Sequence, residues 1–313
     1  MLRLEDIPAA EPGPGEVVLR MLARPINPAD LLVIRGHYGS LPALPATPGN
    51  EGVGIVEAVG PGVGAGLVGL RAVALRGAGT WQELVRARAD HLVSVPDGVS
   101  VEAAAQATVN PLSAWVMLHE VLDVQPGQWI LQNASGSALG RLVIQLAHAS
   151  GARTINHVRR LDQASELKRL GADEVTSEEG DDLLRKVAAL TGGEGVPFAL
   201  DAVGGAGSAT LVRALARDGV LLVHGSLAGR EPMGLSAGRL LTYSLTVRGF
   251  WLNEWLARTS IGQQRDVLQS LLASMAGGLE AGPVAGSFDL SDVHEAVERA
   301  QERGRDGKIL LCG

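Results

Sequence analysis

The sequence predicts an α/β protein that combines a doubly wound parallel sheet with a second, mostly β unit. The middle of the chain alternates short apolar runs with helical patterns, which is typical of a parallel sheet covered by helices. Glycine, proline and short β-like runs dominate residues 1–105, and helices with one last strand follow residue 252. The chain has 313 residues, 46% of them hydrophobic, so it is long enough for about two domains.

The first unit is predicted from its turns and strands. A strand is expected over 16–20, directly after the turn Pro12-Gly13-Pro14-Gly15, and another over 53–59. This pattern favours an antiparallel, partly barrel-like arrangement in residues 1–105. A final strand over 308–311 is expected near the end of the chain.

The central unit, residues 106–251, is predicted from apolar runs separated by amphipathic stretches. Strands are expected over 129–132, 153–158, 198–201, 220–224 and 245–250, and helices over 112–122, 141–150 and 164–170. Asp162 is the expected N-cap of the helix over 164–170. Parallel strands with intervening helices bind ligands at the carboxyl ends of the strands.

A small-residue turn between the strand over 129–132 and the helix over 141–150 indicates a dinucleotide site. Such a turn brings backbone N–H groups and a helix N-terminus close to a pyrophosphate, as in the Rossmann arrangement. Simple packing of a helix against a strand is the alternative explanation. The candidate cofactor residues of this turn are Asn133, Ser135, Gly136, Ser137, Ala138 and Leu139.

Arg159 and Arg160 follow the next strand, where an NAD-binding fold usually offers a carboxylate to the ribose diol. Two guanidinium groups suit a 2′-phosphate instead, so NADPH is the predicted cofactor. The alternative is an ordinary pair of solvated loop arginines.

Composition and charge argue against several classes of partner. The net charge is −7 and the isoelectric point about 5.5, so the chain has no basic footprint for nucleic acid or for a membrane surface. No apolar run approaches the roughly 18 residues of a membrane span and no signal-peptide pattern is present, so a cytoplasmic protein is expected. The only cysteine, Cys312, excludes an internal disulfide and a multi-cysteine metal site.

Several short blocks carry a resemblance that covers nearly the whole chain. They are Ile26-Asn27-Pro28-Ala29-Asp30, Arg35-Gly36-His37-Tyr38-Gly39, Pro48-Gly49-Asn50-Glu51-Gly52, Val109-Asn110-Pro111, Gln132-Asn133-Ala134-Ser135 and Arg248-Gly249-Phe250-Trp251-Leu252. Through them the sequence resembles the medium-chain dehydrogenase/reductase superfamily, most of all its 2-enoyl thioester reductases of the mitochondrial trans-2-enoyl-CoA reductase type. The resemblance implies a GroES-like catalytic domain in residues 1–105 and 252–313 and a Rossmann domain in residues 106–251.

The resemblance also implies a reaction: NADPH-dependent reduction of the C2=C3 double bond of a trans-2-enoyl thioester, carried by CoA or acyl carrier protein, in fatty acid metabolism. Hydride would add to Cβ, and Cα would then need a proton. Tyr38 aligns with the family's catalytic tyrosine, whose phenol can donate to the carbonyl oxygen or deliver that proton. A tyrosine that only packs on its loop is the alternative. The rival functions are an NADPH:quinone oxidoreductase of the same superfamily and a non-catalytic NADPH-binding homologue.

Further cofactor contacts are implied by the same resemblance. Asn110 resembles the family's amide contact on the nicotinamide side, although asparagine also suits a helix N-cap. Lys308 resembles a C-terminal lysine that reaches the cofactor, and an exposed lysine at a strand end is the alternative. The other implied contacts are His224, Gly225, Ser226, Leu227, Phe250, Trp251 and Leu252. A homodimer joined through the edge strand near 245–250 is implied as well.

A metal is not expected, although the superfamily's alcohol dehydrogenases hold zinc with a cysteine and a histidine. Asp30 and Asn50 occupy the corresponding neighbourhoods, and Asp30 with Glu51 is a poor ligand set. The seven histidines show no ligand spacing. Relatives begin with roughly one more strand, so we expect either a start upstream of this sequence or an exposed edge in the first domain.

Overall fold

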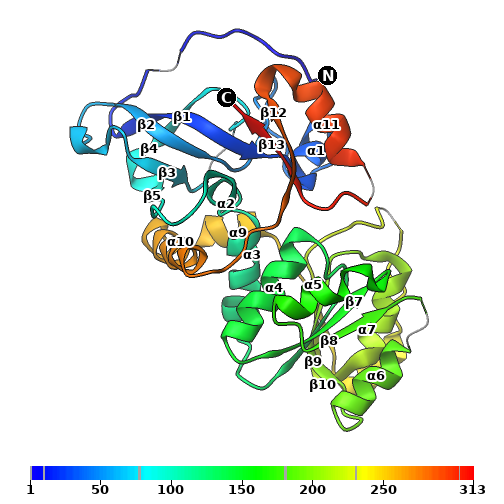
Figure 1. The fold of residues 1–313 in the computed structure, drawn as a ribbon. Helices are drawn as coiled ribbons and strands as arrows, with labels where there is room; N and C mark the ends of the chain where they lie inside the picture. The colour runs from blue at the N-terminus through cyan, green and yellow to red at the C-terminus, as the bar shows by residue number, and fades with distance from the viewer. Residues whose placement is uncertain (1, 10, 77–78, 180–181, 230, 303) are drawn as a thin grey trace. The chain divides into compact units, whose positions relative to one another are not determined.

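The computed structural model describes residues 2–9, 11–76, 79–179, 182–229, 231–302 and 304–313. Its contacts divide the chain into two compact units, drawn in Figure 1. The terminal unit comprises Met1–Leu112 and Leu256–Gly313, and the central unit comprises Ser113–Trp255. The boundaries expected from the sequence follow residues 105 and 251, whereas the contacts divide the chain after residues 112 and 255.

The terminal unit is built on a seven-stranded sheet in the order β12-β13-β1-β2-β3-β5, with β4 also paired to β1. All of its pairs are antiparallel except that of β12 with β13. In Figure 1 the red C-terminal strand lies beside the blue β1. The strands are β1 Glu16–Pro25, β2 Val53–Val59, β3 Arg71–Ala74, β4 Leu84–Arg88, β5 Leu92–Ser94, β12 Val284–Asp289 and β13 Lys308–Cys312.

Apolar side chains on one face of β1, those of Val17, Leu19 and Met21, form a core with β2, β3 and β4. A second core lies under α1 and α11, around Ile26 and Ile309. The helices of this unit are α1 Pro28–Ile34, α2 Val101–Ala105, α3 Asn110–Val116, α10 Ile261–Ala276 and α11 Val293–Gln301, with 3₁₀ turns at Ala65–Leu67, Ala89–His91 and Leu290–Asp292. Helix α3 continues across the boundary into the central unit and ends in a π-helical turn, Met117–Val121.

The central unit has a six-stranded parallel sheet in the order β11-β10-β9-β6-β7-β8. Numbered along the unit, this is the order 6-5-4-1-2-3 of the Rossmann fold, which confirms the predicted doubly wound sheet. The strands are β6 Trp129–Gln132, β7 Arg153–Val158, β8 Glu174–Ser177, β9 Val196–Asp201, β10 Leu215–Val223 and β11 Thr246–Gly249. The helices are α4 Ala138–Ala149, α5 Ala164–Arg169, α6 Leu183–Leu190, α7 Ser208–Ala214, α8 Ala237–Tyr243 and α9 Leu252–Arg258, with 3₁₀ turns at Leu161–Gln163 and Gly205–Gly207.

Three predicted strands, β2, β6 and β7, have the expected bounds, and other elements differ in length or role. The helix expected over 112–122 begins earlier, at Asn110. The prediction that Asp162 caps α5 is wrong. Asp162 lies inside the 3₁₀ turn Leu161–Gln163, and Gln163 takes the cap position. Its carboxylate instead accepts a hydrogen bond from Arg160.

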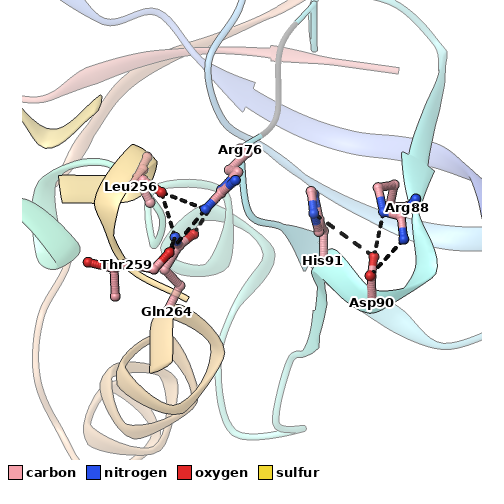
Figure 2. A network of polar contacts seen from close by, with 7 residues as sticks. All are labelled: Arg76, Arg88, Asp90, His91, Leu256, Thr259 and Gln264. Atoms are coloured by element: carbon pink, nitrogen blue, oxygen red, sulfur yellow. Dashed lines mark hydrogen bonds and ion pairs between the residues drawn. The ribbon is translucent and has the colours of Figure 1, made fainter. Parts of the chain in front are cut away.

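A polar network fixes the chain where it re-enters the terminal unit (Figure 2). Arg76 follows β3 with a left-handed φ of 53°, and its guanidinium donates to the carbonyl oxygens of Leu256 and Thr259 and to the side chain of Gln264. Gln264 is fully buried and donates to the same two carbonyl oxygens, both at 2.7 Å. The network therefore ties residues 256–264 to the end of β3. No helix among the residues described above is both long and apolar enough to cross a membrane.

Candidate functional site

The carboxyl edge of the parallel sheet gathers most of the candidate cofactor residues. Because the six strands are parallel, the segments that follow them meet at one edge of the sheet. Asn133, Ser135, Gly136, Ser137, Ala138 and Leu139 follow β6, Arg159 and Arg160 follow β7, His224, Gly225, Ser226 and Leu227 follow β10, and Phe250, Trp251 and Leu252 follow β11. The central unit thus brings together residues that are more than a hundred positions apart in the sequence.

The turn after β6 presents its backbone rather than its side chains. The buried hydroxyl of Ser135 points inward and donates to the carbonyl oxygens of Gln132, at 3.1 Å, and His157, at 3.3 Å. Ser137 is the N-cap of α4 and accepts the N–H of Gly140. A Cβ at Gly140 would lie 2.6 Å from the Ser135 carbonyl oxygen, so only glycine lets α4 approach the turn this closely. The N-terminus of α4 is therefore placed to receive an anion.

Asp201, at the end of β9, holds this turn in place. Its fully buried carboxylate accepts four hydrogen bonds of 2.6–2.9 Å, from Asn133 Nδ2, Ser208 Oγ and the backbone N–H groups of Val203 and Gly204. Asn133 in turn accepts the N–H of Ala202. Burial alone would raise the pKa of Asp201, but the four hydrogen bonds outweigh burial and lower it. Asp201 is therefore ionised at neutral pH and fixes the first residue of the turn.

Sequence reasoning placed Asp201 only as the last residue of a strand and missed this role. The available signal was an acidic residue at a strand end immediately before Ala202-Val203-Gly204-Gly205. Gly204 and Gly205 both have left-handed φ values, 71° and 67°. A carboxylate in front of such a turn suits the free N–H groups that the turn presents.

Arg159 and Arg160 are both exposed at the end of β7. Arg160 forms an ion pair with Asp162 at 3.0 Å, with side chains that are 65% and 55% exposed. An exposed pair of this kind contributes at most about 1 kcal/mol, so it yields easily to another anion. Within the described ranges Arg159 has neither a hydrogen bond nor an ion pair, so its guanidinium is available.

His224 lies just beyond β10, where burial lowers its pKa to about 4 against the opposing charge of Asp201. The imidazole is therefore neutral at physiological pH. In this form it can make hydrogen bonds, but it does not serve as a general acid. A Cβ at Gly225 would lie 2.4 Å from the carbonyl oxygen of Ala202, so this position requires glycine. Leu227 is 65% exposed.

In the terminal unit, Tyr38 lies in the loop after α1. Helix α1 ends at Ile34, and Gly36 adopts a left-handed φ of 72° that turns the chain away from the helix axis. The side chain of Tyr38 is half-buried. Asn110 is also half-buried and is the first residue of α3.

A buried polar cluster lies beside these segments of the terminal unit. Glu51 is 1% exposed and accepts hydrogen bonds from Asn27 Nδ2, at 2.8 Å, from the N–H of Val109, at 2.9 Å, and from the N–H and hydroxyl of Thr108, at 3.2 and 3.3 Å. Lys308 donates from its ammonium to Asn27 Oδ1. The cluster thus joins α1, the loop before β2, the turn before α3 and the start of β13.

Asp30 belongs to the same cluster. It accepts the N–H of Asn27 at 2.7 Å and the side-chain amide of Asn50. Burial raises its pKa to about 7. Burial also raises the pKa of Glu51 and lowers that of Lys308, and in both cases the opposite charge of the other residue opposes the shift.

Comparison with known proteins gives consistent matches. Residues 138–270 match the family described as zinc-binding dehydrogenase, and residues 13–97 match the alcohol dehydrogenase GroES-like domain. The mitochondrial enoyl-[acyl-carrier-protein] reductase of Homo sapiens is 36% identical over 99% of this chain and 84% of its own length.

Two solved structures are similar over nearly the whole chain. A Bacillus thuringiensis protein assigned as an NADPH:quinone reductase has a TM-score of 0.92 and 36% identity, covering 97% of this chain and 92% of its own. The Escherichia coli quinone oxidoreductase in complex with NADPH has a TM-score of 0.87 and 27% identity, covering 99% of this chain and 95% of its own.

The name of the first family raises the question of zinc. In the terminal unit both oxygens of Asp30 accept hydrogen bonds from amides, and Asn50 uses its amide as a donor. Glu51 is fully engaged by Asn27, Thr108 and Val109. Among the residues that the structure describes, no group of three or more histidine, cysteine, aspartate or glutamate side chains could hold a metal ion. These side chains therefore do not fit a catalytic zinc site, which needs three converging ligands.

Proposed function

Because the chain belongs to the medium-chain dehydrogenase/reductase superfamily, we propose that it is a zinc-independent, NADPH-dependent 2-enoyl thioester reductase. The observation that carries the proposal is the 36% identity to an enoyl-[acyl-carrier-protein] reductase over 99% of the chain. The polarising role of a metal then falls to hydrogen-bond donors.

The proposed cofactor site uses the carboxyl edge of the central sheet. The turn Asn133–Leu139 and the N-terminus of α4 hold the pyrophosphate, and Arg159 and Arg160 hold the 2′-phosphate. His224–Leu227, Phe250–Leu252 and Asn110 contact the nicotinamide half. NADPH, when bound, supplies a hydride. The presence of NADPH in the similar Escherichia coli structure supports this choice of cofactor.

Tyr38 is the proposed catalytic residue. Its phenol donates a hydrogen bond to the thioester carbonyl oxygen, where negative charge develops, or delivers the proton that Cα needs. It stands on a loop whose path is set by Gly36 rather than inside a helix or strand. Catalytic groups are often carried by such loops next to a rigid scaffold.

We propose further that two copies associate through β11, which is the last strand in the order of the central sheet. Thr246 and Arg248 of this strand are exposed. Sedimentation of the purified protein tests the dimer. The cytoplasmic location stays a proposal from the sequence, tested by cell fractionation, whereas the human relative is named as mitochondrial.

The deciding experiment follows NADPH oxidation with crotonyl-CoA, a longer trans-2-enoyl-CoA and a quinone in parallel, with NADH as the control cofactor. We expect turnover on the enoyl thioesters with NADPH. In the Tyr38→Phe variant, enoyl reduction should fall at least about tenfold, because a proton donor in the transition state is lost. An unchanged rate in this variant would remove Tyr38 from the mechanism.

Reduction of quinones is the second candidate, favoured by the similarity to the two quinone reductase structures. A quinone needs no proton on carbon, so Tyr38→Phe should then leave the rate unchanged. Turnover on the quinone alone would select this function. A non-catalytic homologue would instead gain thermal stability from NADPH without turnover on any acceptor.

A further inference from the structure

A continuous chain of hydrogen bonds crosses the interior of the terminal unit. The ammonium of Lys308 donates to Asn27 Oδ1, and Asn27 Nδ2 donates to Glu51. Glu51 also accepts the N–H groups of Thr108 and Val109. Lys308, Asn27 and Glu51 are 6%, 3% and 1% exposed. The chain ends at Val109, directly before Asn110, so it connects the start of β13 with the start of α3.

The order of donors and acceptors in this chain is fixed by chemistry. An ammonium only donates and an ionised carboxylate only accepts. The amide of Asn27 lies between them, so its oxygen must face Lys308 and its nitrogen must face Glu51. The carboxylate is then left to accept the backbone N–H groups of Thr108 and Val109. If the amide of Asn27 were flipped, its nitrogen would face the ammonium of Lys308 and its oxygen would face the carboxylate of Glu51.

We propose that Lys308, Asn27 and Glu51 form a buried relay that positions Asn110 for the cofactor, and that Lys308 acts through Glu51 and not by touching the cofactor itself. The proposal rests on the NADPH binding proposed above. Glu51 holds the two residues before Asn110 by their backbone, which sets where α3 begins. Glu51 meets only hydrogen-bond donors, and the positive charge of Lys308 opposes the rise in the pKa of Glu51 that burial causes. The Lys308 nitrogen is itself bound to Asn27. All three are positioning residues.

The Glu51→Gln variant breaks the relay with almost no change in volume. The introduced amide can still offer its oxygen to Val109, but its nitrogen then faces Asn27 Nδ2. Of its two negative neighbours, Lys308 keeps only Asp30. We expect the dissociation constant of NADPH, measured by fluorescence titration, to rise about tenfold. Gln264→Leu is the matched control, since Gln264 is equally buried in the same unit and its bonds go to Arg76, Leu256 and Thr259. It should lower the melting temperature and leave the dissociation constant unchanged.

The Asn27→Asp/Glu51→Gln double variant moves the negative charge one step along the relay. Lys308 then donates to the carboxylate introduced at position 27. That carboxylate also accepts from the amide nitrogen introduced at position 51, and the oxygen of the same amide still accepts from Val109. Every donor again meets an acceptor, so we expect the double variant to bind NADPH more tightly than Glu51→Gln alone. A loss of packing would not be rescued by a second substitution of this kind.

The Lys308→Met substitution, made in the wild type and in the Glu51→Gln background, distinguishes the relay from a direct contact between Lys308 and the cofactor. The relay predicts a large rise in the dissociation constant in the wild type and little further rise in the Glu51→Gln background. If Lys308 touches the cofactor directly, its replacement should raise the dissociation constant of NADPH by the same factor in both backgrounds. Equal factors would overturn the proposal. Normal binding in a folded Glu51→Gln variant would also overturn it. If the wild type itself does not bind NADPH, the proposed function fails instead.

Discussion

Replacing Asp201 tests how the turn after β6 is held. Its carboxylate is fully buried and accepts four hydrogen bonds of 2.6–2.9 Å. Asp201→Ala removes the acceptor of all four donors. The side chains of Asn133 and Ser208 can turn towards other acceptors, but the N–H groups of Val203 and Gly204 cannot. Since an unsatisfied buried donor costs about 1–3 kcal/mol, we expect Asp201→Ala to lower the free energy of unfolding by about 3–5 kcal/mol.

Asp201→Asn is the matched control. Its side-chain oxygen can still accept from Asn133, Val203 and Gly204, and the hydroxyl of Ser208 can rotate to accept from the introduced amide. Only the charge is lost, so we expect a decrease of about 1 kcal/mol. Because the pKa of Asp201 is lowered in the folded state, its stabilisation is present above the ordinary aspartate pKa and is lost as the pH falls through the folded-state value.

Urea denaturation of the wild type and both variants, at neutral and at acidic pH, measures these differences. NADPH titration of the folded variants then reports whether release of Asn133 weakens binding. Equal losses of stability in the alanine and asparagine variants, or a loss below about 1 kcal/mol in the alanine variant, would refute the idea that the carboxylate organises this edge of the sheet.

Two other predictions concern charge. Arg159→Ala should raise the dissociation constant of NADPH about tenfold and leave that of NADH unchanged, since a charge-assisted bond to the 2′-phosphate is lost. Arg160→Ala should have a smaller effect, because Arg160 already forms an ion pair with Asp162. Equal losses for NADH and NADPH would contradict this role. For Asp30, a folded-state pKa of about 7 against an ordinary value of 3.8 means that the wild type loses up to about 4 kcal/mol of stability as the pH rises from about 4 to above 7. Melting temperatures of wild type and Asp30→Asn across this range should therefore diverge, and parallel curves would contradict the assignment.

Local patterns in the sequence predicted the parts of the fold that depend on neighbouring residues. The strand β6 has the expected bounds because it is a short apolar run closed by turn residues. The four-residue strand β8, Glu174–Ser177, was not predicted, since it is too short to show a period and carries two polar side chains that become buried only in the sheet. Asp162 was misplaced as a cap because the 3₁₀ turn before α5 adds a residue that the pattern does not reveal.

What the sequence determined by itself is the class of fold, the turn after β6 and the shared edge at which the segments after parallel strands meet. Only the tertiary structure decided which polar groups support that edge and the start of α3. Asn27 meets Glu51 across 24 positions and Lys308 across 281, and Asn133 meets Asp201 across 68. Burial makes these pairings obligatory, because an ionised group removed from water must find its partners inside the protein. Which partners it finds depends on the path of the backbone, and no local spacing records it.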